Sequence, residues 1–316
     1  DWTERYAPQP EILRYAHYVA DKLDVRGNIE LNTTVTRAVF DEASDTWTVS
    51  TDTGVSARAR YLISATGILS VPSTPKFADM DSFKGEIYHT GDWPHEGVDF
   101  TGKRVGVIGT GSSAIQSIPL MAEQADQLTV FQRTATFTVP AANRPITENE
   151  RKATKRSYKQ LREQARRAGT GVLVDQPVGA FGEVEERIVR GELERRWRGT
   201  GFGTTSVLSD NLRSIEANNY TSQFVRDKIN EIVDDPAVAK LLEPHDYPIG
   251  TKRLALDTNY YDTYNRENVK LVSVRDTPIE RFSPAGIGVG DTEDEFDAVV
   301  LATGFDAATG ALERIQ

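Results

Sequence analysis

Cysteine is absent from this 316-residue sequence. Its absence excludes structural disulfides, zinc sites with cysteine ligands and iron–sulfur clusters. It also excludes flavin-dependent disulfide reductases, because their chemistry requires a redox-active cysteine pair. The four histidines show no metal-binding spacing such as HExxH. We therefore expect no metal site.

Long hydrophobic runs and an excess of positive charge are also lacking. No stretch approaches the roughly 18 consecutive apolar residues that a transmembrane helix requires, and we expect no secretory signal. The formal net charge of −10 disfavours nucleic-acid binding, which needs a basic face. We expect a soluble, cytoplasmic protein with small-molecule partners, no nucleic-acid partner and no membrane association.

The length of the chain allows two domains, each with its own core. The sequence opens at Asp1 without a methionine and closes at Gln316 soon after an apolar run. We expect both ends to be cuts through a larger protein.

Hydrophobic periodicity predicts an α/β fold. Residues 10–24 predict an amphipathic helix, and the nearly continuous apolar run at 61–67 predicts a buried parallel strand. The short runs that predict a β-meander are 29–36, 38–40 and 46–51. Further helices are predicted at 148–168, 184–197 and 218–233, within a helical insertion of about 143–246. Further strands are predicted at 269–274, 280–282 and 287–289.

The clearest motif is a Gly-rich turn between an apolar strand and a helix. In Gly109-x-Gly111-x-x-Ala114, Gly109 permits a tight turn and Gly111 lets backbone N–H groups approach a pyrophosphate. The small Ala114 allows the helix to pack closely on the sheet. The strand, turn, helix and second strand are predicted at 104–108, 109–111, 112–124 and 127–132. This unit predicts a Rossmann-like dinucleotide-binding domain.

The end of the second strand indicates which nucleotide binds. A carboxylate there would favour NAD, but the chain has Arg133 and Thr134. The Arg133 guanidinium is suited to a 2′-phosphate, and NADP is therefore favoured over NAD. A solvated surface arginine is the alternative.

A second motif, Phe83-x-Gly85-x-x-x-His89-x-x-x-Trp93-Pro94, precedes the Gly-rich turn. Taken alone, it could be a structural linker with a hydrogen-bonded core histidine. Together with the turn, it resembles the fingerprint of Baeyer–Villiger monooxygenases of the phenylacetone and cyclohexanone monooxygenase type. The resemblance covers essentially the whole chain.

The resemblance implies a flavoprotein with two dinucleotide-binding domains, in which NADPH, FAD and O2 convert a ketone to an ester or lactone through a C4a-peroxyflavin. It implies a partial FAD domain at 1–96, an NADP domain at 97–257 and a return to the FAD domain at 258–316. Two Ala-Thr-Gly segments, 65–67 and 302–304, resemble the places where such chains cross between domains. Members of the family also have an N-terminal Gly-rich FAD turn and a C-terminal part that this sequence lacks.

The resemblance also assigns roles to particular residues. The adjacent Lys252 and Arg253 would otherwise indicate an exposed basic pair. The resemblance implies that Lys252 contacts the NADP 2′-phosphate together with Arg133 and Thr134, and that Arg253 is catalytic. A fixed guanidinium stabilises negative charge on the peroxide without readily protonating it. Contacts to the NADP pyrophosphate are implied for Gly109, Thr110, Gly111, Ser112, Ser113, Ala114, Ile115 and Gln116, and a contact to the flavin adenine for Val35.

Two other functions stay open. The same flavin chemistry could oxygenate nitrogen or sulfur, although the Trp93-Pro94 end of the fingerprint favours the Baeyer–Villiger reaction. The chain could also be a non-catalytic NADPH-binding fragment. A serine hydrolase is excluded, because Ser112-Ser113 does not lie in a Gly-x-Ser-x-Gly elbow.

Overall fold

The computed structural model describes residues 2–168 and 171–316, which form two compact units. The first unit comprises Thr3–Tyr6 and Thr74–Thr303. The second comprises Trp2, Ala7–Ser73 and Gly304–Gln316. Beyond its first residues, the chain therefore passes between the units after Ser73 and after Thr303.

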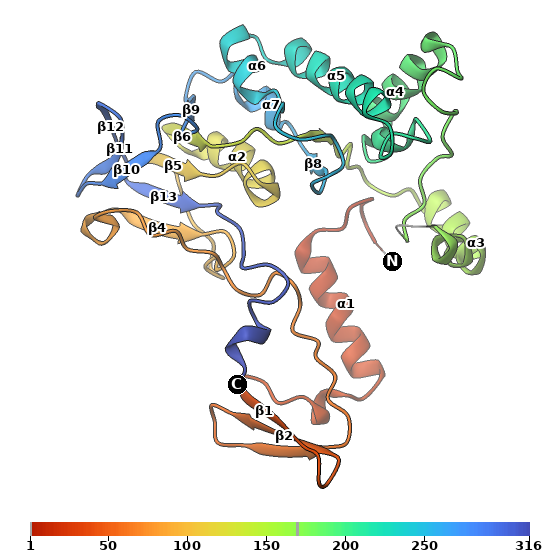
Figure 1. The fold of residues 1–316 in the computed structure, drawn as a ribbon, viewed down its shortest axis with the longest axis vertical. Helices are drawn as coiled ribbons and strands as arrows, with labels where there is room; N and C mark the ends of the chain where they lie inside the picture. Colours follow the sequence, from red (N-terminus) through yellow and green to blue (C-terminus); the bar gives the residue numbers. More distant parts are fainter. Residues whose placement is uncertain (1, 169–170) are drawn as a thin grey trace. The chain divides into compact units, whose positions relative to one another are not determined.

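The first unit contains a five-stranded parallel sheet (Figure 1). Its strands, in spatial order, are β4 (Glu86–His89), β13 (Ala298–Leu301), β5 (Arg104–Ile108), β6 (Gln127–Gln132) and β9 (Val269–Ser273). The central strands β5 and β13 are almost entirely buried, as expected for apolar strands covered on both faces. The strands predicted at 104–108 and 127–132 are thus confirmed, whereas β4 was not predicted.

Helix α2 (Ser112–Gln124) connects β5 to β6 and packs against β6. The helices of the predicted insertion are α3 (Glu148–Arg167), α4 (Glu186–Thr200), α5 (Ile215–Ile232) and α6 (Pro236–Leu242). Leu193 of α4 and Phe224 of α5 share one hydrophobic core with Val107 of β5 and Ile118 of α2. In contrast, α3 has no buried residue. The prediction of helices packed on the sheet domain is therefore confirmed for α4 and α5.

Smaller elements complete the first unit. A parallel pair consists of β7 (Thr138–Pro140) and β8 (Ala255–Asp257), and α7 (Tyr260–Thr263) follows β8. An antiparallel sheet consists of β10 (Ile279–Phe282), β11 (Gly286–Val289) and β12 (Thr292–Glu295). Phe282 of this sheet joins Phe83 and Phe131 in a second apolar cluster.

The second unit contains α1 (Gln9–Lys22) and an antiparallel meander of β1 (Val35–Asp41), β2 (Thr46–Thr51) and β3 (Ser56–Ala59). The predicted helix and meander are confirmed, except that residues 29–34 form no strand. The C-terminal Gln316 exchanges backbone hydrogen bonds with Thr36 and Ala38 of β1.

The buried strand predicted at 61–67 is wrong. These residues form no strand, and Tyr61 and Ile63 are 78% and 86% exposed. A strand requires a hydrogen-bonded neighbour, and no strand in the described ranges pairs with this segment. Apolar composition alone therefore does not make a strand here.

The limits of the two compact units do not coincide with those of the predicted cofactor domains, which remain a prediction. Residues 97–257 lie within the first unit, but so do residues 74–96 and 258–303, because β4, β9 and β13 belong to the same sheet as β5 and β6. The Ala-Thr-Gly segment at 302–304 lies where the chain passes between units, whereas 65–67 lies inside the second unit. Among the described residues, no helix has the length and apolar character needed to cross a bilayer.

Candidate nucleotide-binding site

The carboxyl edge of the parallel sheet brings several predicted residues together. Because all neighbouring strands run parallel, the residues that follow β4, β5, β6 and β13 meet at one edge. Gly109 follows β5 and Arg133 follows β6, while His89 is the last residue of β4. The chain runs from β5 to β6 on one side, and β13 lies on the other side of β5. Ligands of open α/β sheets bind at such a switch point.

The two glycines of the turn have different surroundings. Gly109 has a φ of +108°, and a Cβ atom at this position would lie 2.6 Å from the carbonyl oxygen of Ala302. Gly111 has an ordinary φ of −82°, and no atom lies within 4 Å of the position of a Cβ. The packing of the protein itself therefore requires Gly109, whereas Gly111 leaves open space beside the N-terminus of α2.

The first turns of α2 divide into a buried and an exposed side. Ala114 and Ile115 are fully buried against the sheet, so their side chains serve packing. Ser112, Ser113 and Gln116 are exposed. Gly111 at the N-cap has no side chain to cap the helix, so the first N–H groups are available to an anion. This geometry fits a nucleotide pyrophosphate.

The segment after β6 is held against the Gly-rich turn. The buried Thr110 donates a hydrogen bond from Oγ1 to the carbonyl oxygen of Thr134 (2.9 Å). Arg133, next to Thr134, is exposed, and its guanidinium forms no ion pair within residues 2–168 and 171–316. A free guanidinium beside the turn fits a phosphate monoester.

The turn that carries Lys252 and Arg253 is fixed by a buried asparagine that was not predicted. Asn218 of α5 donates from Nδ2 to the carbonyl oxygen of Ile249 (2.9 Å) and accepts from the Ile249 N–H at Oδ1 (3.0 Å). Gly250 has a φ of +91°. Lys252 and Arg253 are both exposed, and neither forms an ion pair with the rest of the described chain.

Phe83 and Gly85 of the fingerprint have packing roles. Phe83 is buried and meets Phe282 edge to face, with ring centroids 5.9 Å apart. A Cβ at Gly85 would lie 2.5 Å from the Phe83 ring and 2.6 Å from the carbonyl oxygen of Asp297. Only glycine fits at this position.

His89 connects the fingerprint to the second Ala-Thr-Gly segment. Its Nδ1 accepts a hydrogen bond from the Gly91 N–H (2.9 Å). The ring proton therefore lies on Nε2, which donates to Thr303 Oγ1 (3.2 Å). Trp93 packs against Tyr88, at a centroid distance of 5.8 Å, and Pro94 is half-buried. The fingerprint therefore joins the end of β4 to the point where the chain leaves the first unit. Thr303 was missed because nothing in the sequence pairs it with His89.

Val35, the predicted flavin contact, begins β1 in the second unit and is 36% exposed. Its Cα partner across the meander is Thr51.

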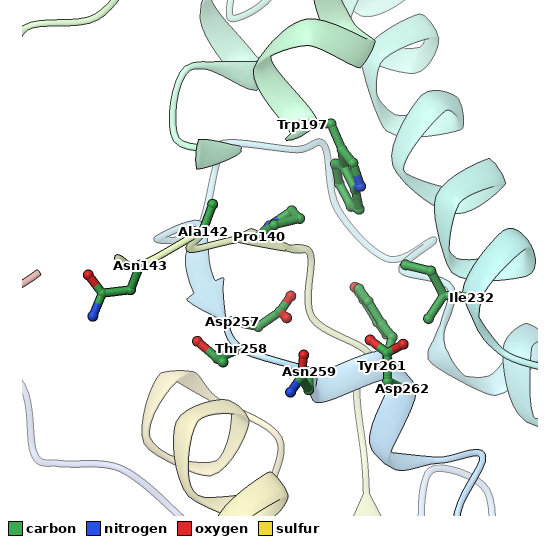
Figure 2. Close-up of a pocket in the computed structure, with 10 residues that line it drawn as sticks. All are labelled: Pro140, Ala142, Asn143, Trp197, Ile232, Asp257, Thr258, Asn259, Tyr261 and Asp262. Carbon is green, nitrogen blue, oxygen red and sulfur yellow. The ribbon is translucent and has the colours of Figure 1, made fainter. Parts of the chain in front are cut away.

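A cavity of about 260 Å³ lies elsewhere in the first unit (Figure 2). Its lining residues are Pro140, Ala142, Asn143, Trp197, Ile232, Asp257, Thr258, Asn259, Tyr261 and Asp262. Burial raises the pKa of Asp257, whose carboxylate accepts a hydrogen bond from Thr138. None of the predicted site residues lines this cavity.

A family model described as pyridine nucleotide-disulphide oxidoreductase matches residues 2–169. The chain belongs to this family. Because the sequence has no cysteine, this member of the pyridine nucleotide-disulphide oxidoreductase family has no redox disulfide in these residues.

Individual relatives are more specific. The chain is 41% identical to a Baeyer–Villiger monooxygenase from Pseudooceanicola batsensis, over 98% of this chain and 57% of that protein. It is 38% identical to a phenazine N-monooxygenase from Lysobacter antibioticus, over 100% of this chain and 58% of that protein. The solved structure of OTEMO in complex with FAD and NADP is 41% identical, with a TM-score of 0.95 over 100% of this chain and 60% of that one.

These matches confirm the predicted resemblance to Baeyer–Villiger monooxygenases and the two-dinucleotide-domain flavoprotein fold. The chain spans about three fifths of the length of these relatives. The cofactors and the activity of the longer proteins are therefore only proposed for this chain.

Proposed function

We propose that this chain is part of an NADPH- and FAD-dependent Baeyer–Villiger monooxygenase, with O2 and a small ketone as substrates and an ester or lactone as product. The observation that carries the proposal is the carboxyl edge of the parallel sheet. The open Gly-rich turn and the His89 end of the fingerprint meet there. Arg133, which has no ion pair among the described residues, lies at the same edge. The relative solved with FAD and NADP supports both cofactors. A cytoplasmic location remains a prediction.

The residues of this chain would hold the nucleotide in two places. The N–H groups of the turn and of the first turn of α2, from Thr110 to Gln116, would bind the pyrophosphate. Arg133, Thr134 and Lys252 would bind the 2′-phosphate, and Val35 would contact the flavin adenine through its backbone. We propose the second unit as part of the FAD domain and the sheet of the first unit as the NADP domain.

Arg253 would be the catalytic residue. When FAD is bound, it supplies the electrons that activate O2. The Arg253 guanidinium would stabilise the negative charge that develops on the ketone oxygen as the carbonyl carbon is attacked, without donating its proton. Its lack of an ion-pair partner among the described residues leaves its charge available for this role.

The test supplies the chain with FAD, NADPH and a cyclic ketone and follows NADPH loss and lactone formation. We expect ketone-stimulated NADPH oxidation with lactone as product. Arg253→Ala should lower lactone formation by about 100- to 1,000-fold, the cost of removing one oxyanion-stabilising donor, while NADPH still reduces bound flavin. Lactone formation at the original rate would refute the role of Arg253.

Heteroatom oxygenation is the second candidate, supported by the similarity to a phenazine N-monooxygenase. Turnover of amines and sulfides in place of ketones would establish it. Tight NADPH binding by a colourless protein that turns over neither class would instead indicate a non-catalytic NADPH-binding fragment.

A further inference from the structure

Tyr247 joins two segments of the candidate nucleotide site. Its hydroxyl donates a hydrogen bond to the carbonyl oxygen of Ala135 (3.3 Å) and accepts one from the Phe137 N–H (3.2 Å). Its ring meets Phe137 edge to face, with centroids 5.6 Å apart. Burial raises the pKa of Tyr247, so the hydroxyl keeps the proton that it donates. The Tyr247 ring is thereby fixed beside the segment that begins at Arg133.

The ammonium group of Lys252 lies over the face of this ring, 4.2 Å from its centroid. A lysine can also be oriented by a carboxylate, but that partner would neutralise its charge. No ion pair to Lys252 exists in the part of the chain that the structure describes. The aromatic face orients the ammonium and leaves its positive charge uncompensated, as an anion-binding lysine requires.

Hydrogen bonds extend from this ring to the Gly-rich turn. Thr110 Oγ1 donates to the Thr134 carbonyl, and the next carbonyl along the chain, that of Ala135, accepts from Tyr247. On the other side, Asn218 forms two hydrogen bonds with the backbone of Ile249. Ile249 lies two residues after Tyr247 and three residues before Lys252. The turn, the Arg133 segment and the Lys252 turn are therefore held in one arrangement.

We propose that Tyr247 is a positioning residue for nucleotide specificity: its ring holds the Lys252 ammonium where it meets the 2′-phosphate that distinguishes NADP from NAD. The inference rests on the proposed nucleotide site. Tyr247 contributes through Lys252, and its loss should affect the two nucleotides unequally, because only NADP carries the additional phosphate.

The test measures dissociation constants of NADP+ and NAD+ by calorimetric titration of the 316-residue chain. Lys252→Met should lower the preference for NADP+ by about tenfold, as expected for one lost charge-assisted contact. Tyr247→Leu should lower it by about fivefold, as expected for a lost cation–π contact. Tyr247→Phe keeps the aromatic face and the packing on Phe137 but loses both hydroxyl hydrogen bonds, so it should retain more of the preference than Tyr247→Leu does. In the double variant Y247L/K252M the preference should equal that of K252M alone.

A second series keeps the shape of the ring, so that folding does not limit the test. Phenylalanines with increasing fluorine content at position 247 weaken the negative face of the ring, and the preference for NADP+ should fall stepwise. An unchanged preference in both Y247L and the fluorinated series, or additive effects in the double variant, would overturn the role of Tyr247. A wild-type protein without any preference, or an unchanged preference in K252M, would instead overturn the proposed phosphate site, and the role of Tyr247 with it.

Discussion

Two apolar segments of this chain end in the same Ala-Thr-Gly sequence but have different structures. Residues 298–301 form β13, with exposures of 2% or less, and lead into 302–304. Residues 61–67 form no strand, and Ile63 is 86% exposed. β13 lies between β4 and β5 and pairs with both, whereas the other segment has no strand neighbour in the described residues. Neighbouring strands, more than apolar composition, decide which segment becomes a buried strand.

The largest effect is expected at the centre of β13. Val300→Asp places a charge where the side chain has no exposed surface, and such a charge costs more than about 4 kcal/mol. We expect the first unit to unfold, as measured by circular dichroism and urea denaturation. The control Val300→Ala should cost about 2 kcal/mol and remain folded. A folded Val300→Asp protein would show that β13 is less enclosed than described.

A smaller effect is expected where β13 approaches the Gly-rich turn. Gly109→Ala brings a Cβ within 2.6 Å of the Ala302 carbonyl oxygen at a φ of +108°, and should lower the free energy of unfolding by about 2 kcal/mol. The matched variant Gly111→Ala, with open space around it, should leave that free energy unchanged while weakening NADP+ binding. Urea denaturation and nucleotide titration distinguish the two. Equal stability of both variants would contradict the close approach.

A pH-dependent contribution is expected from Asp297, the residue before β13. Hydrogen bonds from the Arg104 guanidinium and backbone N–H lower the pKa of Asp297. The stabilisation is therefore fully present above the unfolded pKa of about 3.9 and is lost as the pH falls through the folded value. The Asp297 side chain is 42% exposed, so solvent screening limits the contribution to about 0.5 kcal/mol. Asp297→Asn should remove this contribution at pH 7. The free energy of unfolding, measured by urea denaturation at a series of pH values, should then fall less as the pH is lowered into the acid range. If the variant lost stability in acid as steeply as the original protein, the pH dependence would come from other carboxylates.

The smallest effect is expected in the exposed apolar segment. Ile63→Ser should change the free energy of unfolding by no more than about 0.5 kcal/mol, because the side chain is already in contact with solvent. Urea denaturation of the 316-residue chain measures it. A loss of 2 kcal/mol or more would mean that residues 61–67 are covered in solution, and the contrast with β13 would disappear.

The elements that were predictable from sequence have local signals. The strand, turn and helix around Gly109 follow from spacing within about a dozen residues, and the helix α5 follows from its apolar stripe. The strand β4 was not predicted, because its short sequence is half exposed and gains its structure from pairing with β13, far along the chain. The strand predicted at 61–67 is wrong for the same reason. A strand needs a neighbour to pair with, and no strand among the described residues pairs with this segment.

The candidate site was predictable to a similar extent. The Gly-rich turn and Arg133 lie at the same sheet edge because both immediately follow parallel strands. The supporting residues Asn218, Tyr247 and Thr303 were missed, because each forms hydrogen bonds with a residue more than 30 positions away. No periodicity or spacing rule reports such contacts.

The glycine at the N-cap of α2 makes the helix dependent on what binds beside it. A serine or aspartate there would accept a hydrogen bond from one of the first N–H groups, but Gly111 leaves all of them to a bound anion or water. Any ligand that binds only the folded state stabilises it by an amount that grows with concentration, about 2.7 kcal/mol at one hundred times the dissociation constant. If a dinucleotide fills the proposed site, the melting temperature of this protein should consequently rise with dinucleotide concentration, and its stability would depend on how much free coenzyme is present.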